Sequence, residues 1–371
     1  KMQHPVLRRV KMLDIMAEMD LLKLNHEYRL QIMQGDVHRK LLHTYPDVHF
    51  SLVIDLSLNK IDDISRIDLI NDIYDSIFIM NMLSAMSQVD FYLYQNQQAS
   101  GRMIFTVKND FMISALLVNP DRCMSVTISS NEKNCNPIYH GIKDRCTRES
   151  LLCRRTSMKE MLSSRDYMHS ILSLHSKWGI GHMTEHFLPD DLFHEILDLL
   201  KSSNDELFFD EDHLCYLHSM TQRTLAESEI DLFIHCQALS DLVVDGNLDF
   251  YDQKVHLTLS QRKKYFNHLL HVFETNSNLT FKLAKEPMIL DFKYQTNQCI
   301  FLSDQFSYIR LNTYNWANNL AIINHPNLKH MFDRFFNAVW NDATSELLSD
   351  YSEIHSFFIH IIQQINILSE I

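Results

Sequence analysis

A histidine motif at residues 182–186 has the residue types and the spacing of a metal site. His182, Glu185 and His186 form the pattern HxxEH. In zinc peptidases with this pattern, two imidazoles one helical turn apart bind the metal and the glutamate polarises a water molecule. Pro189 follows closely, so any helix here has barely two turns. We therefore predict no catalytic residue and no metal ligand, and expect His182 and His186 to contact a ligand from a loop bounded by glycines. A metal-dependent hydrolase that uses all three residues is the alternative.

A second pattern, His175-Ser176-Lys177, matches the HxK that begins the catalytic motif of phospholipase D enzymes. Such a phosphodiesterase needs a histidine nucleophile and a lysine that holds phosphate oxygens. The aspartate expected five residues after the lysine is replaced by His182, and the only other HxK in the sequence, at residues 38–40, has Tyr45 at that position. The sequence therefore argues against catalysis of this kind.

Two further side chains complete the candidate ligand site. Trp178 lies next to Gly179, and a loop bounded by glycines is an unusual place for a core tryptophan. Arg310 belongs to a strand predicted at residues 308–311, and its guanidinium suits an anion, although an exposed strand residue is the favoured interpretation. The predicted ligand-binding residues are Trp178, His182, His186 and Arg310.

The composition excludes several classes of function. A net charge of −13 disfavours direct binding to a phosphate backbone. With six glycines in 371 residues and neither a GxGxxG nor a GxxxxGKS/T pattern, no cofactor is predicted. The seven cysteines form no CxxC pair, which is typical of free thiols in a reducing cytoplasm. Because the sequence has no signal peptide and no uncharged apolar run of 18 residues, we expect a cytoplasmic protein with no membrane partner.

The spacing of apolar residues predicts helices first and strands later. Helical periodicity covers residues 4–45, 62–94, 137–174 and 211–242. Strands are predicted at 103–107, 112–118 and 124–129, and again at 279–283, 289–294, 299–302, 308–311 and 320–323, with a closing helix at 326–340. Thr258 and Gln261 form a capping box at the start of another helix.

The two groups of strands suggest an internal duplication. Ile104 and Val126 correspond to Ile300 and Ile322 at a constant offset. The predicted fold class is therefore α+β, with an N-terminal helical region followed by a duplicated, two-lobed α/β-type sensor region. We assign residues 1–98 to a helical, dimerising region, 99–250 to a first α+β lobe with a helical insertion, and 251–371 to a second lobe with C-terminal helices. Two such lobes would enclose a cleft, which is a common ligand site.

A short region near the C-terminus carries a family likeness. It comprises residues 300–304, the strand at 308–311, Pro326-Asn327-Leu328, and the sequence FFNAVW that ends at Trp340. In this respect the chain resembles the ligand-sensing C-terminal region of bacterial helix-turn-helix transcription regulators, which have a non-catalytic phospholipase D-like fold. The resemblance implies an N-terminal DNA-binding helix-turn-helix. None is found in residues 1–45, and because the sequence starts at Lys1 without Met we expect that module to lie upstream.

These observations lead to a hypothesis of function. We expect a non-enzymatic, effector-sensing region of a bacterial transcription regulator that binds a small molecule or a peptide in the cleft between its lobes. The region would form a homodimer and would reach DNA only through a module missing from this chain. Effector binding would shift the population of lobe arrangements. Apart from the metal-dependent hydrolase, the other alternative is a helical protein-interaction module.

Overall fold

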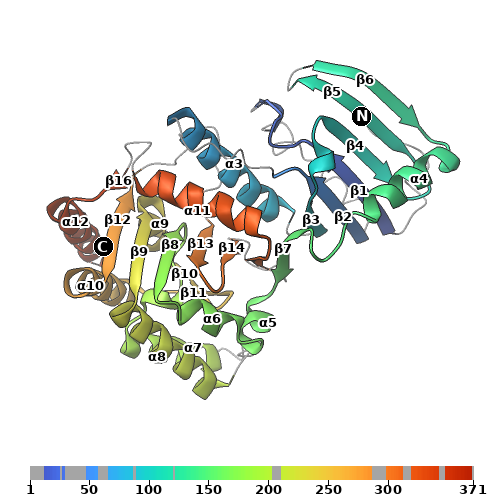
Figure 1. Ribbon diagram of the computed structural model, residues 1–371. Coiled ribbons are helices and arrows are strands. Elements are labelled where there is room, and N and C mark those ends of the chain that lie inside the picture. Colours follow the sequence, from blue (N-terminus) through green and yellow to red (C-terminus); the bar gives the residue numbers. More distant parts are fainter. Residues whose placement is uncertain are drawn as a thin grey trace. The chain divides into compact units, whose positions relative to one another are not determined.

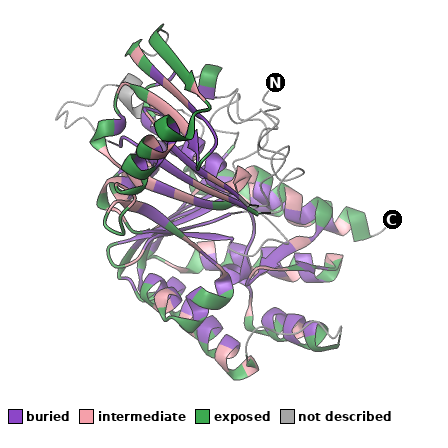
Figure 2. Ribbon diagram, turned by 90° about the vertical axis from the view of Figure 1, so that its right-hand side faces the viewer, coloured by how far each residue is buried: buried purple, intermediate pink, exposed green. Residues whose placement is uncertain are grey.

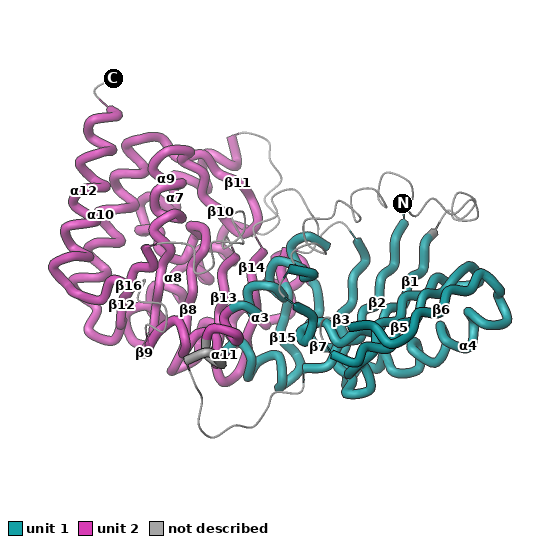
Figure 3. The backbone as a smooth tube through the Cα atoms, turned by 90° about the horizontal axis from the view of Figure 1, so that it is seen from above, with its two compact units in different colours: residues 1–65, 74–155, 321–332 teal, residues 66–73, 156–320, 333–371 magenta. Residues whose placement is uncertain are grey.

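The computed structural model describes residues 12–25, 27–29, 47–56, 66–86, 89–119, 122–202, 210–285, 298–311, 319–341 and 347–369. The chain divides into two compact units, shown in different colours in Figure 3. Unit 1 comprises residues 1–65, 74–155 and 321–332, and unit 2 comprises residues 66–73, 156–320 and 333–371. The three-domain division expected from the sequence stays a prediction.

The predicted fold class is wrong. Most of the described strands belong to one mixed sheet of 14 strands, in the order β16-β12-β9-β8-β13-β14-β15-β7-β3-β2-β1-β4-β5-β6. The described chain therefore does not consist of a helical region followed by two lobes. Strands from both groups that suggested a duplication belong to this sheet, and so do strands from the region expected to be helical.

The N-terminal error has a physical cause. Strands β1 (Met12–Met19) and β2 (Asp47–Ile54) pair in parallel, and most of their residues are buried. A strand buried on both faces has apolar residues at nearly every position, so its pattern does not alternate and is easily mistaken for a helix. The helix expected over 62–94 is present as α3 (Arg66–Ala85), but β3 (Asp90–Gln95) follows it. The expected helical residues 30–45 lie outside the described part of the chain.

Unit 1 is built on the parallel strands β1, β2 and β3, extended by antiparallel pairing (Figure 1). The predicted hairpin strands are confirmed as β4 (Arg102–Val107), β5 (Met112–Asn119) and β6 (Arg122–Ser129), and β4 pairs with β1. Helix α4 (Glu132–Lys143) packs through Tyr139 and Ile142 against Met16 and Val53. The long helix expected from 137 to 174 is instead split into α4, β7 (Leu151–Thr156), α5 (Met158–Ser163) and α6 (Asp166–Ile171).

Unit 2 has three neighbouring parallel strands, β8 (His175–Ile180), β9 (Glu229–His235) and β12 (Leu279–Ala284). Strand β13 (Cys299–Ser303) runs antiparallel to β8, and β14 (Tyr308–Arg310) pairs with β13. Helices of the crossovers are α7 (Asp190–Ser202), α8 (Glu211–Glu227), α9 (Cys236–Asp245) and α10 (Leu259–Thr275), with the hairpin β10 (Asn247–Phe250) and β11 (Gln253–His256) between the last two. Helix α12 (Tyr351–Ser369) packs on α10.

Several local predictions in the second half of the chain are confirmed and one is corrected. The capping box of Thr258 and Gln261 begins α10, and β13, β14, β15 (Leu320–Ile323) and α11 (Pro326–Trp340) occur where they were expected. The helix predicted over 211–242 is interrupted by β9, because residues 230–234, apolar except for Asp231, suit a buried strand as well as a helix. Strands are mostly buried, whereas exposed residues line the outer sides of helices (Figure 2). Among the described helices, none combines the length and apolar character of a bilayer span.

Gly179 in β8 gives a test of the sheet packing. A Cβ atom at this position would lie 2.6 Å from Cζ of Phe233 and 2.9 Å from Cγ2 of Ile300. We predict that Gly179→Ala lowers the free energy of unfolding by about 1–3 kcal/mol, because an overpacked site must shift its neighbours. Urea unfolding followed by circular dichroism measures the difference.

The matched control is Gly141→Ala in α4, where an added Cβ has no atom within 4 Å. Alanine is the better helix former, so this variant is expected to be more stable by about 0.5–1 kcal/mol. Equal stability of Gly179→Ala and the wild type would show that Phe233 does not pack closely against β8.

Candidate functional site

The sheet of unit 2 carries a group of polar side chains on one face. The strand register places Lys177 opposite Asp231, and Asp231 opposite Thr280. One step toward the strand starts, His175 lies opposite Glu229. Because side chains alternate between the two faces of a strand, all five point to the same side. Two cross-strand rows of polar side chains thus lie at the amino ends of β8, β9 and β12.

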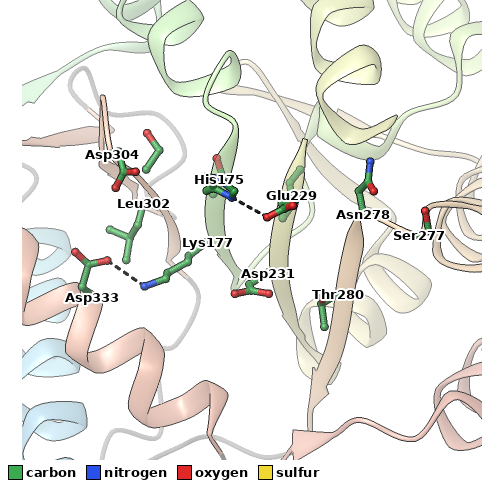
Figure 4. A pocket seen from close by; sticks show the side chains of 13 residues that line it. His175, Lys177, Glu229, Asp231, Ser277, Asn278, Thr280, Leu302, Asp304 and Asp333 are labelled. Atoms are coloured by element: carbon green, nitrogen blue, oxygen red, sulfur yellow. Dashed lines mark hydrogen bonds and ion pairs between the residues drawn. The ribbon is translucent and has the colours of Figure 1, made fainter. Parts of the chain in front are cut away.

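These rows line a pocket of about 330 Å³, which we call the polar pocket (Figure 4). Its lining consists of His175, Ser176, Lys177, Glu229, Ile230, Asp231, Ser277, Asn278, Thr280, Leu302, Ser303, Asp304 and Asp333. Every one of these residues belongs to unit 2. The pocket therefore lies within one compact unit and does not require a cleft between lobes.

The polar pocket has more acidic than basic side chains. Four carboxylates, Glu229, Asp231, Asp304 and Asp333, lie around one lysine and one histidine. The Nδ1 atom of His175 lies 2.8 Å from a carboxylate oxygen of Glu229, and Nζ of Lys177 lies 3.5 Å from a carboxylate oxygen of Asp333. Burial raises the pKa of Asp231, and Lys177 and Lys282 oppose this only in part. The pocket has more negative than positive groups.

Helix α11 closes the same sheet face beyond the pocket. The ring of Phe336 lies 5.2 Å from that of Phe233 on β9, and Nζ of Lys282 lies 4.3 Å from the ring centre of Trp340. Asp333, one turn before Phe336, reaches Lys177. This part of α11 thus covers the carboxyl halves of the strands and leaves the amino ends open, where most of the polar side chains gather.

The opposite face of the same strands contains the residues predicted from the sequence. Arg310 is completely buried, so the favoured interpretation of it as an exposed strand residue is wrong. It donates hydrogen bonds of 2.9 Å to both carboxylate oxygens of Glu185 and one of 2.8 Å to Oδ1 of Asp249. These carboxylates lie in a short 3₁₀ turn, η3 (Glu185–Phe187), and in β10. The arginine therefore links three elements through one buried charge.

His182 joins this network through Asp249 and Cys299. Its Nε2 lies 3.2 Å from Oδ2 of Asp249, and its Nδ1 lies 3.5 Å from Sγ of Cys299. Burial disfavours the charged imidazole, but the neighbouring sulfur and carboxylate outweigh it and raise the pKa of His182 to about 10. The pKa of Asp249 falls to about 2, because Arg310 and His182 outweigh the effect of burial. The contacts run from Cys299 to His182 to Asp249, as in a nucleophilic triad of cysteine, histidine and aspartate. All three side chains are buried, however, and none lines the polar pocket.

His186 and Trp178 lie in the core beside this network. The ring of His186 stacks on Phe301 at 4.9 Å and lies 5.3 Å from the ring of Trp178. Its Nδ1 is 2.8 Å from Oγ1 of Thr184, and burial lowers its pKa to about 4, so the imidazole is neutral near pH 7. Trp178 lies within strand β8 and is buried, so the expected loop is wrong. Gly179 is also part of this strand, and because it has no side chain the ring of Phe233 packs directly against it.

The HxxEH pattern does not form the arrangement of a zinc site. Both oxygens of Glu185 accept hydrogen bonds from Arg310, and Glu185 begins a 3₁₀ turn, whereas a zinc peptidase needs an α-helix. In the described part of the chain, no group of three or more potential ligand side chains could hold a metal ion. The structure therefore brings Trp178, His182, His186 and Arg310 together, but in the interior of unit 2. Their role as ligand contacts stays a prediction.

Sequence reasoning missed most of the polar pocket, although a signal was present. His175 and Lys177 were noted as an HxK pattern and residues 302–304 as part of the family likeness, but none of the lining residues was predicted to form a pocket. At the starts of three buried strands, a polar residue, an intervening residue and a second polar residue follow one another, in the sequences HSK, EID and NLT at 175–177, 229–231 and 278–280; the last begins one residue before β12. Such pairs at the starts of otherwise apolar strands indicate a shared polar edge on one face.

Comparisons with known proteins give limited information. No protein-family model and no curated protein matches the sequence. Among solved structures, the chain is similar to the crystal structure of phosphatidylserine synthase from Haemophilus influenzae Rd KW20, with 11% identity and a TM-score of 0.30. The match covers 99% of this chain and 89% of that chain. The matched protein has a phospholipase D-like fold, and nothing in the match indicates a transcription regulator.

The same comparison corrects one expectation. The matched protein is an enzyme, and the expectation of a non-enzymatic protein is withdrawn. At this TM-score the likeness assigns no reaction to the chain, so activity must be argued from its own residues.

The buried ion pairs of Arg310 predict a large effect of one substitution. Arg310→Met keeps an unbranched side chain but leaves Glu185 and Asp249 buried without their partner. We expect the free energy of unfolding to fall by about 3–5 kcal/mol, because an uncompensated buried charge is costly. Chemical unfolding at pH 7 measures this loss.

The control is Arg223→Met, which removes an exposed ion pair with Glu227 and is expected to change stability by less than about 0.5 kcal/mol. Adding Glu185→Gln and Asp249→Asn to Arg310→Met should restore part of the loss, because two of the three carboxylates that face Arg310 are then neutral and only Asp252 keeps its charge. A similar small effect of both arginine variants would contradict the buried network.

Proposed function

We propose that the polar pocket binds a small polar effector and that this region is the effector-sensing part of a bacterial transcription regulator. One observation supports ligand binding above all. Two rows of polar side chains lie side by side on a sheet face, in a pocket with room for a small molecule. A sheet face in a compact unit is normally covered by apolar packing, so polar groups retained there need another explanation.

The charges of the pocket favour a ligand with a positive group. Glu229 and Asp333 are each paired with a basic residue of the pocket, whereas Asp231 has a raised pKa because burial destabilises its charged form. An ammonium group of a ligand would stabilise that carboxylate. Hydroxyl and amide side chains, those of Ser277, Asn278 and Thr280, add hydrogen-bonding capacity for polar atoms of the same ligand.

A signal could leave the pocket through helix α11. The ion pair between Lys177 and Asp333 joins the floor of the pocket to this helix. A ligand ammonium would compete for Asp333 and weaken that link, so ligand binding would favour a different placement of the second half of α11. This is a population shift driven by differential contacts with the ligand. The regulatory role itself, and the use of DNA through another module, rest on the sequence resemblance alone.

Ligand binding is tested with a panel of small metabolites. We expect primary amines that also bear hydroxyl groups to raise the melting temperature, because a ligand that binds only the folded state stabilises it. Asp231→Asn should weaken binding at least tenfold in calorimetry and keep its fold, since burial already favours the neutral side chain. Asp198→Asn, on the exposed side of α7, is the matched control and should bind normally.

Binding that is equal in both variants would place the ligand elsewhere. Failure of every amine, together with binding of anionic compounds, would contradict the proposed ligand class.

A second function, phosphodiester cleavage, is favoured by one specific observation. The 2.8 Å contact between Nδ1 of His175 and Glu229 orients the imidazole, and Lys177 on the same strand face can hold phosphate oxygens. Attack of Nε2 on phosphorus would form an N–P bond and break a P–O bond, and water would then hydrolyse the phosphohistidine. Against it, His175 is the single histidine among the pocket residues, so no second imidazole there protonates the leaving oxygen.

This second function predicts slow hydrolysis of bis(p-nitrophenyl) phosphate by the purified protein. His175→Ala should abolish turnover, and Glu229→Gln should lower kcat by about 10–100-fold because the imidazole loses its orienting partner. His194→Ala, on the exposed side of α7, should leave the rate unchanged. Turnover that survives His175→Ala would come from another site or from a contaminant.

A further inference from the structure

Two carboxylates of the polar pocket lack a basic partner. Glu229 and Asp333 each form an ion pair with a basic residue of the pocket. Among the described residues, no such pair involves Asp231 or Asp304, although both line the pocket. Burial raises the pKa of Asp231, so its charged form lacks full compensation. A carboxylate of this kind gains most from a cation that a ligand brings.

The two carboxylates lie on opposite sides of β8 (Figure 4). Asp231 is on β9, directly opposite Lys177. Asp304 comes directly after β13, whose last residue pairs with Ser176, so Asp304 lies at the level of His175. The two aspartates are thus separated by two strand spacings and by two residues along the strands, which places their Cα atoms about 12 Å apart.

The surface between the two carboxylates suits a methylene chain. Leu302 of β13 pairs with Lys177 of β8, and both side chains line the pocket. The charged end of Lys177 lies toward α11, with Nζ 3.5 Å from a carboxylate oxygen of Asp333 and 5.9 Å from the ring centre of Phe336. The apolar stem of the lysine and the side chain of Leu302 therefore lie between the carboxylates. A positive group in the middle of a ligand would be repelled by the same lysine.

From this arrangement we propose that the polar pocket binds a linear diamine, with one ammonium group at Asp231, the other at Asp304 and the methylene chain across Leu302. The proposed function, on which this rests, requires one ammonium group, and the diamine adds a second. Each carboxylate and its contact of about 2.8 Å with an ammonium take up part of the span, which leaves about 6–9 Å between the two nitrogens. A chain of about four to six carbons covers this distance, because each bond of about 1.5 Å advances an extended chain by about 1.25 Å.

Calorimetry with two probes of equal length tests the role of the second carboxylate. Butanediamine carries an ammonium group at each end of its chain, whereas aminobutanol carries a hydroxyl group at one end. We expect the diamine to bind the full-length protein at least about tenfold more tightly, because a hydrogen bond between two charged groups is stronger than one to a hydroxyl. In Asp304→Asn the diamine should lose this advantage. The affinity for aminobutanol should change by no more than about twofold, because Asp231 still holds its ammonium group.

The matched control is Asp198→Asn, a change at an exposed aspartate of α7, which should keep the preference for the diamine. A series of diamines tests the span between the carboxylates. Affinity should be highest for chains of four to six carbons, and propanediamine should bind more weakly because its nitrogens do not reach both aspartates at once.

Equal binding of butanediamine and aminobutanol by the wild type overturns the diamine assignment and leaves the proposed function intact. A preference for the diamine that survives Asp304→Asn also overturns the assignment, because the second ammonium group then lies elsewhere. Failure of both probes to bind overturns the assignment together with the proposed function.

Discussion

The structure of unit 2 depends on the compensation of one buried positive charge. Arg310 has no exposed surface, and its guanidinium is paired with Glu185 and Asp249. Removing a charge from water costs several kcal/mol, which is recovered only when the partners are held in good geometry. The 3₁₀ turn at Glu185 and strand β10 must therefore keep their places relative to β14. Through Asp249, the same requirement extends to His182 and to the neighbouring thiol of Cys299.

Strand β8 lies between this network and the polar pocket and serves both. Lys177 points to the pocket, and Trp178, the next residue, points to the buried side where His186 and Phe301 pack. Gly179 then admits the ring of Phe233, which in turn contacts Phe336 of α11. Of these three successive residues, Lys177 places a charge in the pocket, Trp178 packs in the core, and Gly179 makes room for the ring that contacts α11. Packing on the other side of the same strand thus holds the strand that lines the pocket.

The sequence allowed some of this to be predicted, and the failures have physical causes. Strands β4, β5, β6, β13, β14 and β15 and the cap of α10 follow from local patterns and turn residues. Strands β1 and β9 were assigned to helices, because a strand buried on both faces has no alternation. The four candidate residues do lie together, but their burial depends on partners such as Asp249, far away in the sequence. Most of the pocket residues were not predicted from the sequence, because the two rows of polar side chains form only when β8, β9 and β12 align in register.

The alternation of β8 has a consequence for how this protein can change during evolution. Side chains that determine what the pocket accepts stand on one face, and those that determine whether unit 2 folds stand on the other. A substitution at Asp231 or Thr280 does not touch the ion pairs of Arg310, so recognition can diverge at little cost in stability. Relatives of this chain would then differ in their ligands while sharing the interior. The buried network would be the better marker of common descent, and the pocket the better marker of specialisation.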